Sequence, residues 1–242
     1  MDYLLSVFFG NTMKIEHLIF DLDNTLYSPD AKMDAGITFR MMSCVAEFFG
    51  VSYEEGLRIR EGRIKKFSTT LEWLRSEGLT DIETYFSKVH PENEADELEE
   101  DVRLRPLLES IEIPKIVHTN APREHAERVL SKLKIRDLFD CVCDIRDCGL
   151  KGKPYPDAYR TALEKCGGNI DNTIFFDDLY KYTDGYAAMG GTAVLMGTKN
   201  GHHLDSDSSS AFKGVPPHPG RTLRAASIYD VPALLEQIKQ MD

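Results

Sequence analysis

Four short apolar runs, at residues 17–20, 115–118, 173–176 and 192–196, recur along the chain. Apolar runs of this length are typical of strands buried on both faces of a parallel sheet. Between the runs, apolar residues recur at helical spacing, for example over 126–133 and 158–166. Strands that alternate with helices predict an α/β fold with a doubly wound parallel sheet, similar to a Rossmann fold. In such sheets, functional residues follow the carboxyl ends of the strands.

The stretch over 29–108 has a different pattern, because it is typical of helices and contains no clear strand. Apolar residues recur every three or four positions over 37–48, and residues 52–55 form a capping box that begins another helix. We therefore predict a smaller helical domain inserted into a discontinuous α/β core. The predicted core comprises residues 13–28 and 109–242.

Three further segments look peripheral. The strongly acidic run over 91–101 is typical of a solvated face or loop. Residues 197–221 are rich in Gly, Ser, Asp, His and Pro, which indicates a mobile loop. The apolar segment 1–12 has an acidic residue where a secretion signal needs positive charge, so it is predicted to pack on the body or to precede an alternative start at Met13. Four residues of the polar loop could bind a metal, but a flexible polar loop explains them without one: His202, His203, Asp205 and Asp207.

Composition narrows the class of protein. The chain has 242 residues, of which 42% are hydrophobic and 29% charged, which excludes a wholly disordered chain. The net charge of −11 disfavours nucleic-acid polymers as partners, since phosphate affinity requires clustered Lys and Arg. An anionic small substrate stays possible, because it needs only a local positive site or a metal. No apolar run approaches the roughly 18 residues of a membrane span, so no membrane association is expected.

Five cysteines, an odd number without any CxxC pair, favour free thiols in a reducing compartment. We therefore predict a cytoplasmic protein. Cys141, Cys143 and Cys148 lie close in sequence, but their spacing matches no standard zinc pattern and lacks a fourth ligand. The oligomeric state is not set by any pattern in the sequence.

The clearest chemical signal is the pair of carboxyl groups at Asp21 and Asp23, directly after the first apolar run and followed by Thr25. One carboxylate of such a pair can attack as a nucleophile while the other moves a proton. Together they can hold a hard cation such as Mg²⁺ through oxygen. The competing interpretation is a pair of turn or helix-capping aspartates.

Polar residues that suit a phosphate group follow the other runs. Thr119 and Asn120 stand at the start of a helix, where hydroxyl, amide and backbone groups can donate to phosphate oxygens. His118 alternates with Thr119 and is predicted to face away. Lys153, before Pro154, can neutralise a phosphoryl group, whereas Lys151 is predicted to be a surface residue. Asp177 and Asp178 end the third run and are further candidate Mg²⁺ ligands.

These four motifs, in this order, resemble the signature of the haloacid dehalogenase (HAD)-like hydrolase superfamily. The resemblance covers the chain from about 14 to 196, and residues 228–231 resemble its closing strand and helix. It implies a Rossmann-like core with a helical C1 cap. It also implies a phosphatase mechanism in which Asp21 forms an aspartyl-phosphate and Asp23 acts as acid and then as base. Dehalogenating members generally lack a second aspartate at this position, so Asp23 favours phosphoryl transfer.

The resemblance also implies the roles of the remaining site residues. Mg²⁺ would bind Asp21, Asp178 and the backbone carbonyl of Asp23, with Asp177 close by. The phosphate-binding residues would be Thr25, Thr119, Asn120 and Lys153. In one departure, Tyr182 stands where many relatives carry Asn or Asp, with Asp184 two residues further on. This change either weakens the orientation of Lys153 or of the metal ligands, or is compensated by Asp184.

Within the superfamily, the motifs resemble the pyrimidine 5'-nucleotidase branch, which implies a nucleoside 5'-monophosphate as substrate. Phe67, Thr69 and Thr70 are then candidate substrate contacts from the cap, with core packing or helix capping as the alternative. Other phosphomonoesters remain open as substrates, such as phosphoglycolate, sugar phosphates or pyridoxal phosphate. A phosphomutase and a phosphate-binding regulatory protein are the competing functions.

Overall fold

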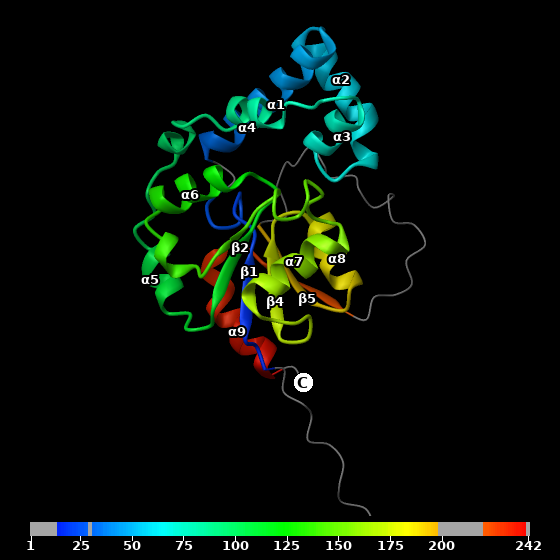
Figure 1. Ribbon diagram of the computed structural model, residues 1–242. Coiled ribbons are helices and arrows are strands. Elements are labelled where there is room, and N and C mark those ends of the chain that lie inside the picture. Colours follow the sequence, from blue (N-terminus) through cyan, green and yellow to red (C-terminus); the bar gives the residue numbers. More distant parts are fainter. Residues whose placement is uncertain (1–13, 29–30, 198–219, 241–242) are drawn as a thin grey trace, which may run out of the picture.

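The computed structural model describes residues 14–28, 31–197 and 220–240 (Figure 1). The predictions for the segment 1–12 and for most of the loop over 197–221, with its candidate metal ligands, lie outside the described residues.

A six-stranded sheet forms the centre of the molecule. Its strands are β1 (His17–Phe20), β2 (Lys115–His118), β3 (Val142–Cys143), β4 (Thr173–Asp177), β5 (Thr192–Met196) and β6 (Arg221–Ala225). The strand order is β3-β2-β1-β4-β5-β6, and every neighbouring pair is parallel. This confirms the predicted α/β doubly wound fold. It also places β1 in the interior of the sheet, between β2 and β4.

Two strands escaped the sequence prediction. The strand β3 has only two residues, too few for a hydrophobic pattern. The strand β6 has three half-buried residues, one exposed arginine and a final buried alanine, so it lacks a continuous apolar run. The closing strand was expected at 228–231, but that segment instead forms the 3₁₀ helix η4 (Ile228–Asp230) and begins helix α9 (Val231–Gln240).

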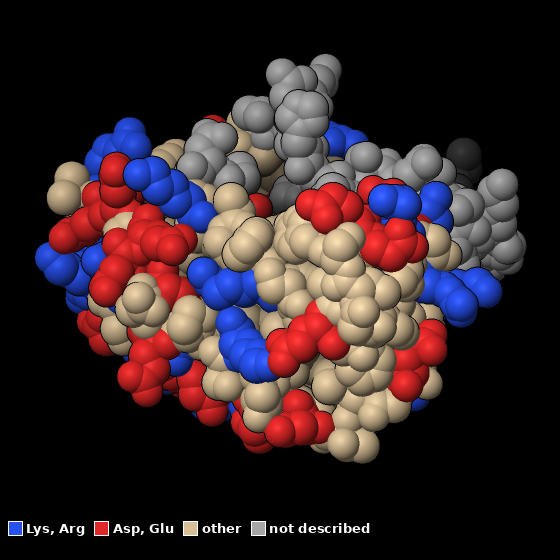
Figure 2. All heavy atoms as spheres, turned by 90° about the horizontal axis from the view of Figure 1, so that it is seen from above, with Lys and Arg blue, Asp and Glu red and all other residues tan. Residues whose placement is uncertain are grey.

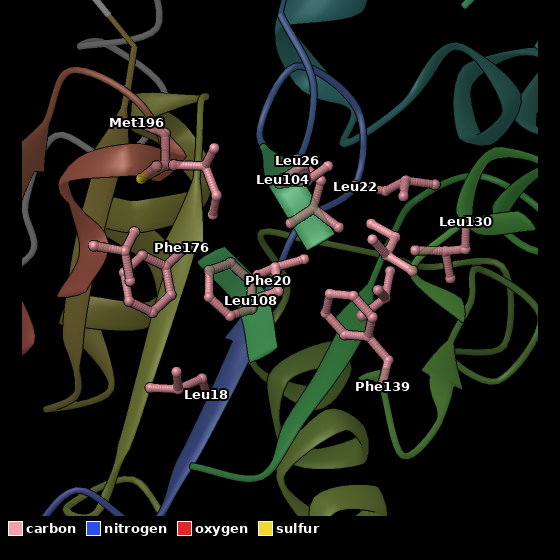
Figure 3. Packing of buried hydrophobic residues seen from close by; sticks show 14 of the residues in the cluster. Leu18, Phe20, Leu22, Leu26, Leu104, Leu108, Leu130, Phe139, Phe176 and Met196 are labelled. Carbon is pink, nitrogen blue, oxygen red and sulfur yellow. The ribbon is translucent and has the colours of Figure 1, made fainter. Parts of the chain in front are cut away.

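Helices cover both faces of the sheet (Figure 1). Helices α5 (Leu104–Glu109), α6 (Arg123–Lys132) and α9 share one apolar cluster with Leu18 and Phe20 of β1. Figure 3 shows its centre, where the rings of Phe20 and Phe176 stack with centroids 4.5 Å apart. Helices α7 (Pro156–Cys166) and α8 (Tyr180–Ala188) pack on the other face against Ile19 and Phe175.

A layer of helices stands over the carboxyl ends of the strands (Figure 1). It comprises α1 (Lys32–Phe49), α2 (Tyr53–Arg63), the 3₁₀ helix η1 (Ile64–Lys66), α3 (Thr70–Ser76) and α4 (Ile82–Val89). Side-chain oxygens of Ser52 and Thr69 cap α2 and α3, as their positions before the first helical turns require. The layer has its own apolar cluster, built around Trp73, and this cluster includes Ile145 from the loop after β3.

The exact domain limits at 28/29 and 108/109 remain a prediction. Leu98, Leu104 and Leu108, which lie inside the predicted helical domain, pack with the cluster on the sheet. The 3₁₀ helix η2 (Glu94–Glu97) and α5 therefore connect the helical layer to the flank of the sheet.

The acidic run over 91–101 is only partly a solvated face. Most of its carboxylates are exposed, but Glu94 is buried. Burial of a carboxylate requires charged or hydrogen-bonding partners, which are described with the site below. Viewed from the helical end, Asp and Glu side chains spread over the surface, with Lys and Arg in separate small groups (Figure 2).

Within the described residues, no helix is both long and apolar enough to cross a membrane.

Candidate active site

The turn after β1 positions the first two candidate carboxylates. Asn24 adopts the left-handed conformation with φ of 60°, and its side chain donates to Asp34 over 3.1 Å. Asparagine tolerates this conformation better than most residues, which allows a tight turn here. Leu22 and Leu26 anchor the turn in the core, and Thr25 Oγ1 donates to Asp21 Oδ2 over 3.3 Å.

The Asn120 side chain links the segment after β2 to the loop that precedes α7. Its side-chain oxygen accepts from the backbone N–H of Lys153 over 2.8 Å, and its amide nitrogen donates to the Lys153 carbonyl over 3.0 Å. A Cβ at Gly152 would lie 1.9 Å from Asn120 Oδ1, so the approach requires glycine. The Asn120 side chain therefore holds the lysine loop, in addition to any contact with phosphate that sequence reasoning assigned to it. Thr119, also buried, accepts from the Ala121 N–H over 3.0 Å.

Lys153 lies fully buried between two carboxylates. Its Nζ is 2.6 Å from Asp21 Oδ1 and 2.6 Å from Asp177 Oδ2. Burial alone would lower the pKa of Lys153, but Asp177 and Asp21 raise it above its ordinary value. Lys151 is exposed. The structure thus separates the two candidate lysines by burial, with Lys153 at the site.

Carboxylate oxygens of Asp21, Asp177 and Asp178 lie within 4.8 Å of one another. Burial, opposed by Lys153, raises the pKa of Asp21 well above its ordinary value and that of Asp177 to about 6. Three neighbouring carboxylates, two of them buried, match the ligand preference of a hard cation, and a divalent ion would offset their repulsion. The residues present therefore fit Mg²⁺. The side chain of Asp23 is not part of this group.

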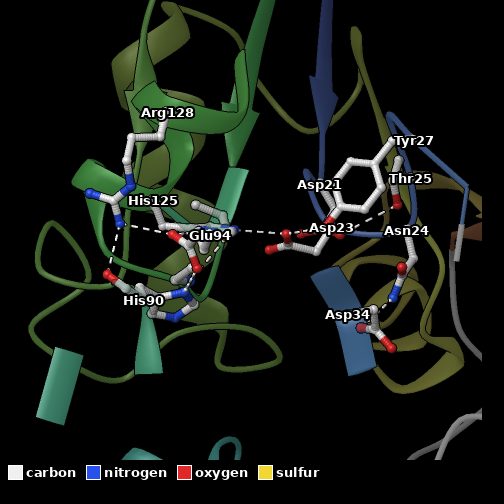
Figure 4. Close-up of polar contacts among 12 residues, drawn as sticks. Asp21, Asp23, Asn24, Thr25, Tyr27, Asp34, His90, Glu94, His125 and Arg128 are labelled. Carbon is white, nitrogen blue, oxygen red and sulfur yellow. Dashed lines mark hydrogen bonds and ion pairs between the residues drawn. The ribbon is translucent and has the colours of Figure 1, made fainter. Parts of the chain in front are cut away.

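Asp23 instead points toward His125 of helix α6, as Figure 4 shows. Its Oδ1 accepts from the Tyr27 hydroxyl over 2.6 Å and lies 2.8 Å from Nε2 of the buried His125. Burial favours a raised pKa at Asp23, but His125 and Tyr27 outweigh it and lower the pKa below its ordinary value. At His125, Asp23 and Glu94 overcome burial and raise the pKa to about 9.

Glu94 is the buried partner on the other side of His125. His125 Nδ1 lies 2.8 Å from Glu94 Oε1, which also accepts from Arg128 over 2.8 Å. Glu94 Oε2 lies 3.0 Å from His90 Nδ1 and 3.7 Å from an Arg40 nitrogen. Sequence reasoning missed His125 and treated Glu94 as part of a solvated run. No sequence pattern distinguishes Glu94 from its acidic neighbours.

Tyr182 occupies the position that carries Asn or Asp in many relatives of the predicted family. It is buried, and its ring centroid lies 5.1 Å from Lys153 Nζ. The Phe175 ring lies 5.4 Å from the same nitrogen. Two aromatic rings therefore add cation–π attraction to the ammonium group, whose charged partners are Asp21 and Asp177. Asp184 accepts from the Tyr180 hydroxyl over 3.3 Å.

The three candidate substrate residues of the helical layer have structural partners. Thr69 caps α3 by accepting from the Glu72 N–H over 3.1 Å. Thr70 is buried and accepts from Arg60 Nε over 3.0 Å. Phe67 packs against the cluster around Trp73. These contacts correspond to the packing and capping alternative.

A second group of possible metal ligands comes from β2, β3 and the loop after β3. His118 is buried, and one of its ring nitrogens lies within 4.8 Å of the Cys143 and Cys148 thiols. The two sulfurs are 3.9 Å apart, and Cys141 is not part of the group. In the described part of the chain no fourth such ligand joins it, so the set is incomplete for tetrahedral zinc. All five cysteines are free thiols.

Comparison with known proteins identifies the family. The model of the haloacid dehalogenase-like hydrolases matches residues 15–181, so the chain belongs to this family of hydrolases. The predicted superfamily is thereby confirmed.

Solved structures show the same fold at low sequence identity. A HAD phosphatase from Thermococcus onnurineus is 18% identical with a TM-score of 0.59, over 92% of this chain and 98% of that one. An L-2-haloacid dehalogenase from Xanthobacter autotrophicus is 13% identical with a TM-score of 0.54, over 92% and 98%. A candidate beta-phosphoglucomutase from Thermotoga maritima is 20% identical with a TM-score of 0.52, over 92% and 99%. Because their names cover three reactions, the fold alone does not select the chemistry.

Proposed function

We propose that the protein is a Mg²⁺-dependent phosphatase of small phosphomonoesters, with nucleoside 5'-monophosphates as the first candidates. One observation carries the proposal: a second carboxyl group follows the Asp21–Lys153 ion pair and has separate partners. This is Asp23, which contacts His125 and not Lys153. A halide leaves without a proton, whereas an alcohol leaving from phosphorus needs one. A separate acid–base group therefore suits an ester better than a haloacid.

In the proposed first step, a carboxylate oxygen of Asp21 attacks phosphorus and the bond to the ester oxygen breaks. Asp23, whose pKa is lowered by His125, must first take up a proton. It then gives this proton to the leaving oxygen, and the phosphoryl group stays on Asp21. In the second step, Asp23 takes a proton from water, whose oxygen attacks phosphorus and breaks the bond to Asp21. Inorganic phosphate and the original carboxylate result.

The remaining residues act by charge and position. Lys153 would neutralise the charge of the phosphoryl oxygens. Thr119 and backbone N–H groups of the loop after β2 would donate hydrogen bonds to them. Mg²⁺, held by Asp21, Asp178 and the Asp23 carbonyl beside Asp177, would supply further positive charge at the phosphoryl group. The nucleotide preference and the C1 cap rest on the sequence resemblance, and the substrate contacts of Phe67, Thr69 and Thr70 stay a prediction.

The test is phosphate release from a panel of esters with Mg²⁺ or with EDTA, using wild type and Asp21→Asn. The panel contains UMP, CMP, AMP, phosphoglycolate, a sugar phosphate and pyridoxal phosphate, with chloride release from 2-chloropropionate as a separate arm. We expect Mg²⁺-dependent phosphate release that falls at least about 1,000-fold in Asp21→Asn, because the nucleophile is lost.

Other outcomes of the same panel contradict the proposal. Chloride release without phosphate release indicates a dehalogenase. Transfer of phosphate between sugar positions without net release indicates a phosphomutase. Ligand binding without turnover by folded wild type indicates a regulatory protein.

A further inference from the structure

The contacts of Asp23 are concentrated on one of its two oxygens. Tyr27 and His125 both approach Oδ1, and the side chain is 28% exposed. Among the described residues, no hydrogen-bond donor contacts Oδ2. The carboxyl group is thus held by one oxygen and presents the other for proton transfer.

His125 is itself fixed at both ends of its ring. It lies in the first turn of α6, fully buried, with Nε2 facing Asp23 and Nδ1 facing Glu94 at 2.8 Å each. Because both ring nitrogens have carboxylate partners, the ring cannot turn without losing a buried polar contact. The orientation of Asp23 therefore depends on the position of Glu94.

Glu94 is in turn held by residues from two parts of the fold. Arg128, one turn after His125 on α6, donates to it from the flank of the sheet. Arg40 of α1 and His90, directly after α4, contact it from the helical layer. A buried carboxylate with four cationic or polar partners has little freedom to move. Figure 4 shows this line of contacts from Arg128 and His90 through Glu94 and His125 to Asp23.

We infer that His125, supported by Glu94, is a positioning residue that orients Asp23 toward the leaving oxygen of the substrate. The inference rests on the proposed phosphatase function, in which Asp23 protonates that oxygen. His125 reaches the reaction only through Asp23. Its loss is therefore expected to affect substrates according to how much their leaving group needs a proton.

The test compares two esters that differ in this need. The p-nitrophenolate of p-nitrophenyl phosphate is stable as an anion, whereas the alkoxide leaving from UMP or glycerol phosphate requires protonation. kcat/KM reports the steps up to formation of the aspartyl-phosphate, so it isolates the protonation step. The variants are His125→Asn, whose amide reaches the position of Nδ1, and His125→Gln, whose amide reaches that of Nε2.

In His125→Asn we expect kcat/KM for the alkyl ester to fall about 100-fold, and for p-nitrophenyl phosphate less than about 10-fold. His125→Gln restores a donor to Asp23 and should return the alkyl ester to within about 10-fold of wild type. Glu127→Gln, on the same helix but paired with Arg136, is the matched control and should behave as wild type. Equal losses on both esters, or none, would overturn the inference.

The remaining outcomes separate this inference from the proposed function. If wild type releases no phosphate, or Asp21→Asn stays active, the proposed function fails and the inference fails with it. If wild type is active, Asp21→Asn is inactive and His125→Asn shows no preference between esters, only the inference fails. If His125→Asn does not fold, as judged by circular dichroism, the same contrast between esters in Glu94→Gln decides.

Discussion

Asp21 and Asp23 lie two residues apart, yet their carboxyl groups have opposite surroundings. Asp21 belongs to a group of three neighbouring carboxylates and shares the ammonium group of Lys153 with Asp177. Asp23 faces the donors Tyr27 and His125. The first environment suits a cation-binding nucleophile and the second a group that exchanges a proton. Two chemically identical residues thus acquire different properties from partners that are distant in sequence.

The same contrast recurs in two buried histidines. His118 lies on the Lys153 side, where burial and the lysine charge lower its pKa to about 3. His125 lies on the Asp23 side, where Asp23 and Glu94 overcome burial and raise its pKa to about 9. At neutral pH the first ring is therefore neutral and the second is a cation. The two sides of the site therefore differ in whether they stabilise a protonated histidine.

The largest expected change in stability comes from removing Lys153, the cation on the Asp21 side. Lys153→Met leaves Asp21 and Asp177 buried without their partner, which should lower the free energy of unfolding by about 3–5 kcal/mol. On the Asp23 side, Tyr27→Phe removes one of two donors and should cost about 1–3 kcal/mol. Urea unfolding monitored by circular dichroism measures both. The exposed Lys151→Met is the control, and a Lys153→Met cost no larger than that of Lys151→Met would refute the buried ion pair.

A smaller effect should distinguish the two carboxylates by their response to Mg²⁺. At a concentration 100 times its Kd, a ligand that binds only the folded state adds about 2.7 kcal/mol of stability. We expect Mg²⁺ to raise the Tm of wild type and of Asp23→Asn, because the Asp23 side chain lies outside the acid group. Asp178→Asn should lose most of the increase. Thermal melts with Mg²⁺ or EDTA provide the measurement, and equal increases in all three proteins would exclude this site.

The smallest effect is a pH dependence of opposite sign on the two sides. Between about pH 3 and 6.5 the unfolded chain binds a proton at His118 that the folded protein excludes, so His118 makes stability fall as pH falls. Between about 6.5 and 9 the folded protein holds a proton at His125 that the unfolded chain releases, so stability falls as pH rises. Each slope is at most about 1.4 kcal/mol per pH unit.

Urea unfolding at pH 5, 7 and 8.5 checks this prediction. His118→Gln should flatten the acid side alone, and His125→Gln the alkaline side alone. Charged and titratable groups near each ring also influence its pKa. They are Lys153 and Asp147 near His118, and Asp23, Glu94 and His90 near His125. A shared change of slope in both variants would show that the histidines do not act separately.

The sequence predicts the Asp21 side far better than the Asp23 side. Asp21, Thr119 and Asp177 each follow an apolar run, and the carboxyl ends of parallel strands meet at one edge, so their convergence could be expected. His125 and Glu94 follow no such rule. His125 is separated from Asp23 by 102 positions and from Glu94 by 31, and only the packing of α6 and η2 brings them together. Strands as short as β3 are equally invisible, because two residues cannot carry a pattern.

The place of β1 in the sheet also has a consequence for synthesis. β1 precedes both of its neighbours in the chain, and the whole helical layer lies between it and β2. During translation, Leu18, Ile19 and Phe20 emerge from the ribosome long before Lys115 and Thr173, whose strands pair with theirs. An apolar segment with two unpaired edges can associate with other chains. The helices over 32–89 share an apolar cluster of their own and are complete in the chain before β2 is made, whereas β1 gains its second partner only when β4 has been made.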